Sequence, residues 1–308
     1  MRSKTLIALL AASALALTAC GGDDGAEPGT EDTAPVTSTD PTESEPTDGE
    51  PMTFEAGTTM AELSDAGSIK IGTKFDQPGF GLKGLSGGPE GFDVEVAKII
   101  AGAMGIEEDG IEWVETPSKV REEVIEQGKV DMVVATYTMN EKRAERIAFA
   151  GPYYLAGQQL MVATDDEEIT GPESLKDMPD KKVCSVTGST PAEQIKEYLA
   201  DESQLVLFDV YDKCADALRT GQVQAVTTDN VILLGFVSES DGEFKLVGEQ
   251  FTEEPYGIGI EKGDTAFCEF INETLMENED AYNEAWSSTA GAVEGASPAE
   301  LPTPDACA

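Results

Sequence analysis

The chain has 308 residues and a formal net charge of −40, because 60 Asp and Glu residues outnumber 20 Lys and Arg residues. This charge excludes nucleic acid as a natural partner, since the phosphate backbone would be repelled. The sequence contains no His, which excludes Ser-His and Cys-His catalysis and removes the commonest zinc ligand, so we expect no metal and no cofactor.

The first 20 residues predict a bacterial lipoprotein signal peptide. Arg2 and Lys4 precede an apolar stretch, 6–17, that is too short to span a bilayer comfortably. The stretch ends in Leu17-Thr-Ala-Cys20, which fits a lipobox whose Cys is acylated. We therefore expect Cys20 to be lipidated and to anchor the protein to a membrane. The alternative is an ordinary secretory peptide with a chance Cys.

Residues 21–55 predict a disordered, acidic tether. The part up to Pro51 is rich in Thr, Ser, Pro, Gly, Asp and Glu and contains no aromatic residue. No Lys or Arg occurs between Cys20 and Lys70. Such a segment cannot bury enough apolar surface to become ordered, and its like charges extend it. Its Ser, Thr and Pro content would also permit O-glycosylation.

The remaining sequence alternates predicted strands with predicted helices. Strands are predicted at 68–73, 111–115, 130–136, 160–163, 182–186, 205–208, 224–228 and 256–261. Helices are predicted at 92–104, 117–127, 191–199, 213–220, 229–235 and 264–276, from apolar residues at helical spacing, a glycine that follows the helix at Gly128 and a proline in the first turn at Pro191. The alternation predicts an α/β architecture with mainly parallel sheets.

Four cysteines follow Cys20: Cys184, Cys214, Cys268 and Cys307. An even number in an exported chain predicts two disulfides, for which three pairings are possible. We favour Cys184–Cys214 with Cys268–Cys307, because each bridge then closes a loop within one stretch of the chain. A loop of that size gives about 3–4 kcal/mol of stabilisation in the chain-entropy model. Unpaired buried thiols are the alternative.

The run Val130–Arg143 indicates a carboxylate site. Its predicted strand ends in hydroxyl residues, Thr136 and Thr138, and a helix then begins with Arg143 in its first turns. A helix start offers unpaired N–H groups, and the planar guanidinium of Arg matches a carboxylate. The alternative interpretation is an ordinary surface helix with a solvated Arg.

Six stretches together resemble the family-3 solute-binding proteins of polar amino-acid ABC importers. In the family's order they are Ile71–Pro78, Gly91–Val96, Val130–Arg143, Thr187–Thr190, Ala225–Asp229 and Tyr256–Ile260. Within the family, the chain is most similar to actinobacterial glutamate-binding lipoproteins, for which Gly-Thr-Lys-Phe-Asp-Gln-Pro at the first strand is typical. The resemblance implies a monomeric receptor that is lipid-anchored to the outer face of the cytoplasmic membrane of a Gram-positive cell. It would capture an amino acid, with L-glutamate favoured, and deliver it to the permease subunits of an ABC transporter.

The fold that this resemblance implies is the two-lobed, type II periplasmic-binding-protein-like fold. Two crossover hinge strands would join the lobes, and ligand would lie in the cleft between them, at the carboxyl ends of the sheets. Lobe 1 is expected to comprise 60–157 and 252–308, and lobe 2 to comprise 158–251.

The resemblance also implies how the carboxylate of the amino-acid head is bound. Arg143 matches the position that clamps the α-carboxylate, and Thr136 and Thr138 match positions that assist it. Ser189 and Thr190 match a turn of lobe 2 that caps the same carboxylate. The threonines have a purely structural alternative, in which they only end a strand.

Asp229 matches the acidic residue that pairs with the α-ammonium, although it could instead only cap the following helix. Lys74 stands where relatives that bind basic amino acids have an acidic residue, and as a point charge it suits a side-chain carboxylate. Its alternative is a surface Lys at a strand end. Gln77, Ser118 and Arg121 are further candidates for the side-chain pocket. Because Gln77 could help to select an amide, glutamine is the nearest competitor of glutamate, and aspartate is a second one.

Two other classes of function occur on the same fold. Cyclohexadienyl-dehydratase-like enzymes would need a catalytic acid in the cleft, and transglycosylase-like relatives would need an appended lytic domain. A sensory receptor would need a membrane helix or a signalling domain, and we find neither in the sequence. We therefore expect a binding protein and not an enzyme.

Overall fold

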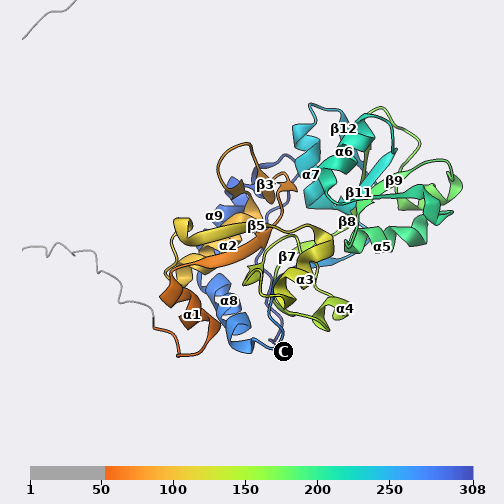
Figure 1. Ribbon diagram of the computed structural model, residues 1–308. Coiled ribbons are helices and arrows are strands. Elements are labelled where there is room, and N and C mark those ends of the chain that lie inside the picture. The colour runs from red at the N-terminus through yellow and green to blue at the C-terminus, as the bar shows by residue number, and fades with distance from the viewer. Residues whose placement is uncertain (1–52, 308) are drawn as a thin grey trace, which may run out of the picture. The chain divides into compact units, whose positions relative to one another are not determined.

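The computed structural model describes residues 53–307, which belong to one compact unit (Figure 1). The predicted signal peptide, the predicted acylation site Cys20 and the predicted tether up to residue 52 lie outside the described residues. Phe54 packs edge-on against Phe270, with 5.5 Å between ring centroids. Within residues 53–307, no helix is long and apolar enough to cross a membrane.

The first sheet has five strands in the order β5-β1-β6-β13-β7. Its strands are β1 (Ile69–Thr73), β5 (Ile111–Glu115), β6 (Met132–Val133), β7 (Ala148–Ala156) and β13 (Glu254–Ile260). β1 pairs in parallel with β5 and β6, and β13 runs antiparallel to β6 and β7. The main core forms where helices α2 (Phe92–Ala103), α8 (Thr265–Glu277) and α9 (Glu279–Ser288) bury apolar residues on this sheet.

The second sheet also has five strands, in the order β10-β9-β11-β8-β12. They are β8 (Gln158–Ala163), β9 (Val183–Val186), β10 (Leu205–Phe208), β11 (Ala225–Asp229) and β12 (Phe244–Val247). β9 runs parallel to β10 and β11, whereas β8 is antiparallel to β11 and β12. Helices α5 (Thr190–Gln194), α6 (Tyr211–Arg219) and α7 (Asn230–Glu239) accompany it.

The structure also contains a small third sheet, three further α-helices and several 3-10 helices. A three-stranded sheet contains β2 (Asp76–Gln77), β3 (Gly81–Lys83) and β4 (Pro89–Glu90). The remaining α-helices are α1 (Thr59–Ala66), α3 (Arg121–Glu126) and α4 (Glu141–Ala144). Short 3-10 helices occur at Glu108–Gly110, Ser118–Val120, Pro172–Asp177, Ile195–Tyr198, Glu202–Gln204 and Ala290–Ala292.

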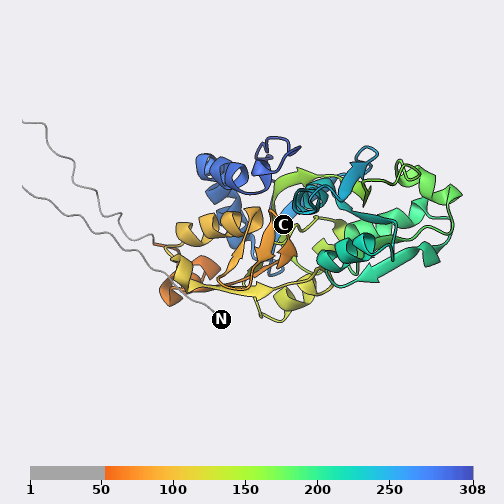
Figure 2. The same cartoon turned by 90° about the horizontal axis from the view of Figure 1, so that it is seen from above.

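The chain crosses between the two sheets twice. It leaves the first sheet at the end of β7 and enters the second at β8, and it returns between β12 and β13. Figure 2 shows the two sheets side by side, with the crossing segments between them. The predicted α/β fold with two lobes and two crossover strands is confirmed. The lobe limits 60–157 with 252–308 and 158–251 stay a prediction.

The predicted strand 130–136 is wrong in its length, because the ladder stops at Val133. Thr136 has a positive φ of 44°, and its backbone N–H donates to the carboxylate of Asp93 at 2.8 Å instead of to a neighbouring strand. The predicted helix 191–199 is also interrupted, since α5 ends at Gln194 and continues as a 3-10 turn.

Several elements were not predicted at all, namely α1, β7, β12, α9 and the three-stranded sheet. β7 contains Gly151-Pro152, and a Pro inside a run argues against a strand. The structure accommodates it because β7 is an edge strand of its sheet.

Both favoured disulfides are present. Cys184–Cys214 joins β9 to α6 with 5.5 Å between Cα atoms, and Cys268–Cys307 joins α8 to the C-terminal segment with 5.9 Å. The first bridge therefore links the strand that leads into the 187–190 turn to a helix that borders the same region.

Candidate ligand-binding site

The sequence-predicted site residues meet where strands of both sheets end. Lys74 and Gln77 follow β1, Thr136 and Thr138 follow β6, Arg143 lies in α4, Ser189 and Thr190 follow β9, and Asp229 is the last residue of β11. In parallel sheets the carboxyl ends of strands lie at one edge, which is where ligands bind in open α/β sheets. All of these residues are buried except Thr190, which is half-buried.

A narrow inner cavity lies between the two sheets. Residues from both sides line it: Ser118, Arg121, Thr136, Thr138, Ser189, Thr190, Pro191, Tyr211, Thr228, Asp229 and Ile232. Its volume is about 10 Å³, which is about the room that one water molecule needs. An amino acid does not fit in that volume, so the two sides must separate for one to enter.

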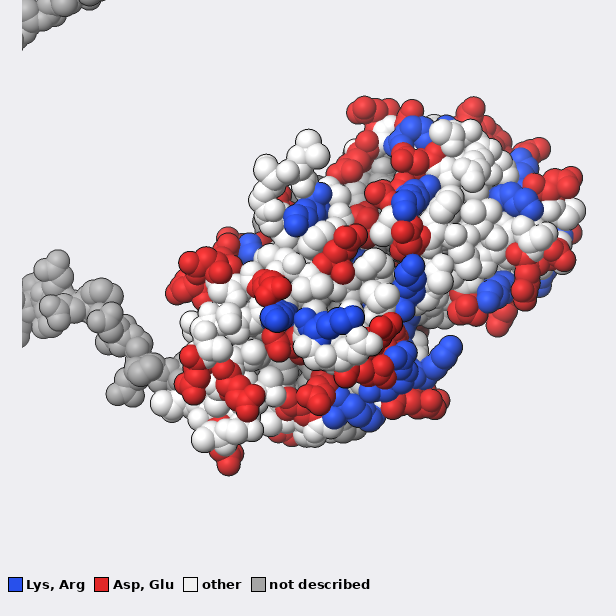
Figure 3. Space-filling model, viewed as in Figure 1, with Lys and Arg blue, Asp and Glu red and all other residues white. Residues whose placement is uncertain are grey.

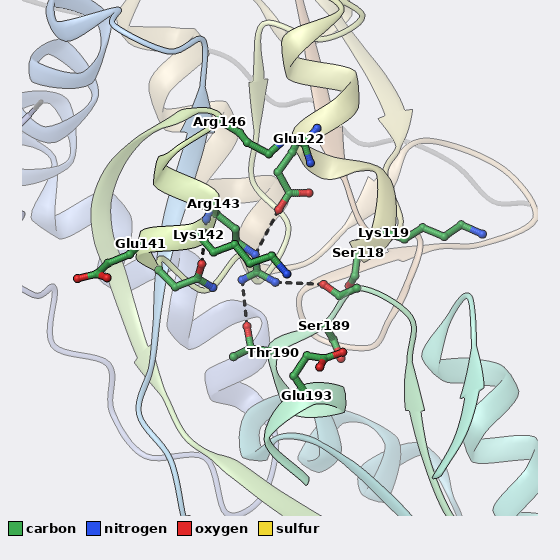
Figure 4. A pocket seen from close by; sticks show the side chains of 12 residues that line it. Ser118, Lys119, Glu122, Glu141, Lys142, Arg143, Arg146, Ser189, Thr190 and Glu193 are labelled. Carbon is green, nitrogen blue, oxygen red and sulfur yellow. Dashed lines mark hydrogen bonds and ion pairs between the residues drawn. The ribbon is translucent and has the colours of Figure 1, made fainter. Parts of the chain in front are cut away.

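A larger outer pocket of about 600 Å³ adjoins this cavity. Its lining residues, shown in Figure 4, are Ser118, Lys119, Glu122, Asn140, Glu141, Lys142, Arg143, Arg146, Gly188, Ser189, Thr190 and Glu193. Arg143 borders the outer pocket and not the inner cavity, and neither cavity is lined by Lys74 or Gln77.

Arg143 connects the two sides of the site. Its Nη1 donates to the backbone oxygen of Thr138 at 2.5 Å and to the hydroxyl of Thr190 at 3.0 Å, and its Nη2 donates to the backbone oxygen of Gly188 at 3.1 Å. Its Nε lies 3.3 Å from a carboxylate oxygen of Glu122. Burial, followed by the charge of Arg121, lowers the pKa of Arg143 to about 10. With 7% of its surface exposed, this is not the solvated Arg of an ordinary surface helix.

Asp229 is a buried carboxylate that is only half satisfied. Its Oδ2 accepts from the hydroxyl of Tyr256 at 2.6 Å, whereas its Oδ1 is buried with no hydrogen-bond partner. The side chain makes no capping bond to α7, so the helix-cap alternative is not what the structure shows. Burial, followed by the charge of Glu254, raises the pKa of Asp229. An oxygen of this kind suits a donor such as an ammonium group.

Glu254 was missed by the sequence reasoning. It lies at the start of β13, on the second crossover, and is fully buried. Its Oε2 accepts from the hydroxyl of Thr138 at 2.7 Å, and its Oε1 accepts from that of Thr252 at 2.9 Å. Burial raises the pKa of this carboxyl group. No local signal distinguishes this Glu from the other acidic residues of so acidic a chain.

Lys74 is buried rather than a surface Lys, with 3% of its surface exposed. Its Nζ donates to the hydroxyl of Ser118 at 2.7 Å. Among the described residues, no carboxylate lies within 4.0 Å of this amine. Burial, followed by the charge of Arg121, lowers the pKa of Lys74 to about 7.

Arg121 is a second buried cation beside Lys74. Its Nη1 donates to the backbone oxygens of Ala135 at 2.9 Å and Thr136 at 3.2 Å, and its Cζ lies 4.1 Å from the centre of the Tyr137 ring. Its Nε is buried without a partner. Only 2% of Arg121 is exposed, yet it lines the inner cavity.

Gln77 and Ser189 use their polar groups within the protein. The oxygen of the Gln77 amide accepts from the hydroxyl of Thr136 at 3.0 Å, which leaves its Nε2 buried without a partner. The hydroxyl of Ser189 caps α5 by accepting from the backbone N–H of Ala192 at 3.1 Å. Thus Gln77 offers a donor to its surroundings, whereas Ser189 has a structural role as a helix cap.

The fold and this site define the class of the protein. Residues 69–284 match the sequence profile of the bacterial extracellular solute-binding proteins, family 3, and the chain belongs to this family.

Among curated relatives, the glutamate-binding protein GluB of Corynebacterium efficiens is 43% identical over 231 residues, which covers 72% of this chain and 77% of the relative. The ABC transporter glutamine-binding protein GlnH of Bacillus subtilis is 38% identical, covering 74% of this chain and 83% of the relative. Both relatives are named as binding proteins.

Solved structures agree with the fold. An ancestral arginine-binding protein bound to glutamine superposes with a TM-score of 0.67 at 33% identity, covering 72% of this chain and 97% of that one. The ancestral amino acid-binding protein AncCDT-1, a precursor of cyclohexadienyl dehydratase, gives a TM-score of 0.68 at 27% identity, covering 75% of this chain and 99% of that one.

Proposed function

We propose that this protein is a cell-surface receptor that binds L-glutamate. The observation that carries the proposal is the pair of buried cations, Lys74 and Arg121, that have no carboxylate partner among the described residues. A buried charge without a partner in contact is costly, and Asp76 and Asp93 act on Lys74 only from beyond 4.0 Å. Two such cations side by side favour a ligand that brings a carboxylate into direct contact with them.

In this proposal Arg143 and Asp229 bind the amino-acid head. The guanidinium of Arg143 would exchange its contacts with Thr190 and Gly188 for the α-carboxylate, since charge-assisted, bidentate hydrogen bonds are the stronger ones. The unpartnered Oδ1 of Asp229 would accept from the α-ammonium. Thr136, Thr138, Ser189 and Thr190 complete this end of the site.

Hydrogen-bond donors of the protein would recognise the side chain of the bound amino acid. The Nε of Arg121 and the Nε2 of Gln77 have no acceptor. The ammonium of Lys74 makes one hydrogen bond, to Ser118, and so has further N–H donors to offer. A carboxylate accepts from every one of them, whereas an amide brings donors of its own that would find no acceptor. This donor excess favours glutamate over glutamine, although relatives named for each of these ligands are similar to the chain.

The same proposal covers the setting in which the protein works. We propose the two lobes at the limits predicted from the sequence, acylation of Cys20, and a monomer at the outer face of the cytoplasmic membrane. The protein would deliver its ligand to ABC permease subunits and would not act as an enzyme. Support comes from the lipobox-like sequence and from relatives that are named as binding proteins, one of them of an ABC transporter.

Calorimetric titration of the purified protein with the twenty amino acids tests the function. We expect glutamate to bind tightest, with aspartate and glutamine weaker. Tight binding of arginine or lysine with no glutamate signal would refute the assignment. Turnover of prephenate or arogenate would show that the enzyme alternative is correct.

A further inference from the structure

The outer pocket lies beside the inner cavity. Ser118, Ser189 and Thr190 line both spaces. Arg143 borders the outer pocket. An amino acid that approaches Arg143 from solvent therefore comes close to the residues that line this pocket.

The lining of this pocket contrasts with the rest of the chain in its charge. Four of the 20 Lys and Arg residues line it, but only three of the 60 Asp and Glu residues do. On the face seen in Figure 3, several basic side chains form a broken row with acidic side chains between them, and acidic side chains are scattered over most of the remaining face.

Most of the acidic groups of the pocket are already paired. Glu122 pairs with Arg143, and Glu193 pairs with Lys196 outside the pocket. Among the described residues, Lys119 and Lys142 have no carboxylate within 4.0 Å. Both are exposed, and Figure 4 shows Lys142 next to Arg143 in the view and the side chain of Lys119 extending away from it. Their charges are thus available to a ligand in the pocket.

We propose that the outer pocket is an encounter site for amino acids of net negative charge, with Lys119 and Lys142 as the residues that attract them. The inference rests on the proposed function and adds to it a step that a neutral amino acid does not share. A chain of net charge −40 repels a monoanion at long range, so the association rate depends on a local region where the sign of the field is reversed. Clefts lined by one sign of charge raise association rates in this way.

The position of the two lysines suits this role in an open molecule as well. Lys119 belongs to the 3-10 helix before α3, and Lys142 belongs to α4. Both elements belong to the part of the chain before β8 that also carries Arg143. When the two sides separate to admit a ligand, the lysines stay beside the residue that receives the α-carboxylate.

The test is the association rate measured by stopped-flow tryptophan fluorescence on the full chain. The variant is the double substitution Lys119→Gln with Lys142→Gln. Its charge-matched control is Lys129→Gln with Lys176→Gln, at exposed positions that do not line the pocket. At an ionic strength of about 10 mM, where screening extends over about 30 Å, we expect the pocket variant to bind glutamate about three- to tenfold more slowly. The dissociation rate, the association rate of glutamine and all rates of the control should remain close to wild type.

The difference should shrink toward none at about 0.5 M salt, because exposed charges are then screened within a few ångströms. An unchanged association rate, an equal slowing of glutamate and glutamine, or an effect confined to dissociation would overturn the encounter site while leaving the glutamate receptor in place. A wild-type protein that binds glutamine but not glutamate would overturn the proposed function itself, and the inference with it.

Discussion

Replacing Lys74 by Met should convert a glutamate-preferring site into one that hardly distinguishes glutamate from glutamine. Met keeps most of the volume of the buried side chain but removes the ammonium, whose only hydrogen bond to residues 53–307 is the one to Ser118 at 2.7 Å. A hydrogen bond between charged groups contributes about 1.5–3 kcal/mol. We therefore expect a loss of about 2 kcal/mol for glutamate, or about 30-fold in Kd. Glutamine, which makes a neutral bond at most, should lose less than about fivefold.

The pH dependence of binding provides a second signature of Lys74. Its pKa is lowered to about 7 by burial and by Arg121, and a ligand carboxylate beside it would raise that pKa in the complex. Binding of glutamate then takes up a proton at high pH. The affinity is fully present below pH 7 and is lost as the pH rises through about 7, by up to tenfold per unit. Glutamine binding and the Met variant should lack this decrease.

The assay is a set of paired calorimetric titrations with both ligands at pH 6, 7, 8 and 9. Lys176→Met is the control, since it removes an exposed Lys that lines neither cavity. Equal losses for glutamate and glutamine would refute the reasoning, because Lys74 would then support the fold or the amino-acid head. A glutamate Kd that does not change between pH 7 and 9 in the wild type would refute it as well.

Three further outcomes are expected. Arg143→Ala should weaken the binding of every amino-acid ligand by at least about a hundredfold, because two charge-assisted hydrogen bonds are lost. The control Arg219→Ala, at an exposed surface pair, should leave binding unchanged. Calorimetry with both variants checks this, and near-normal affinity of Arg143→Ala would show that the carboxylate lies elsewhere. Gly235→Ala should weaken the binding of glutamate and glutamine alike by about 5- to 150-fold. Its Cβ would lie 2.4 Å from the backbone oxygen of Pro78 across the cleft, and overpacking costs about 1–3 kcal/mol. The control is Gly102→Ala, where nothing lies within 4 Å, and equal affinities of the two variants would show that closure does not need the Gly235–Pro78 contact. Removing the Cys184–Cys214 bridge by a double Ala substitution should lower the free energy of unfolding by about 3–4 kcal/mol for a separation of 30 residues, and a urea titration that gives less than about 1 kcal/mol would contradict that.

Contacts between the sheets show why closure depends on more than the ligand contacts. Asp76 on β2 accepts from the backbone N–H of Tyr211, the first residue of α6, at 2.6 Å. The turn at Gly188 approaches Lys119 so closely that an added Cβ would lie 2.6 Å from its Cα. A side chain at Gly188 would therefore obstruct closure in the same way as one at Gly235.

Local patterns in the sequence determined most of the secondary structure. Apolar periodicity located the helices at 92–104 and 264–276, because burial of one face is a local property of the pattern. Spacing alone favoured the disulfide pairing that the structure contains. The run Val130–Arg143 predicted a carboxylate site, since hydroxyls at a strand end followed by an Arg near a helix start are close together in the chain, and that site stays a prediction. The donors and acceptors that they use were not readable from that run.

The tertiary structure alone decided how the site is charged. Lys74 meets Ser118, Thr138 meets Glu254, and Arg143 meets Thr190 and Gly188, in each case across more than 40 residues of sequence. Whether a buried charge has a partner depends on such long-range neighbours. The sequence therefore identified Lys74, Asp229 and Arg143 as candidates. Only the fold shows that, among the described residues, no carboxylate lies within 4.0 Å of Lys74 or Arg121 and that the Asp229 side chain makes no capping bond to its helix. Burial and pairing are fixed when the two sheets come together.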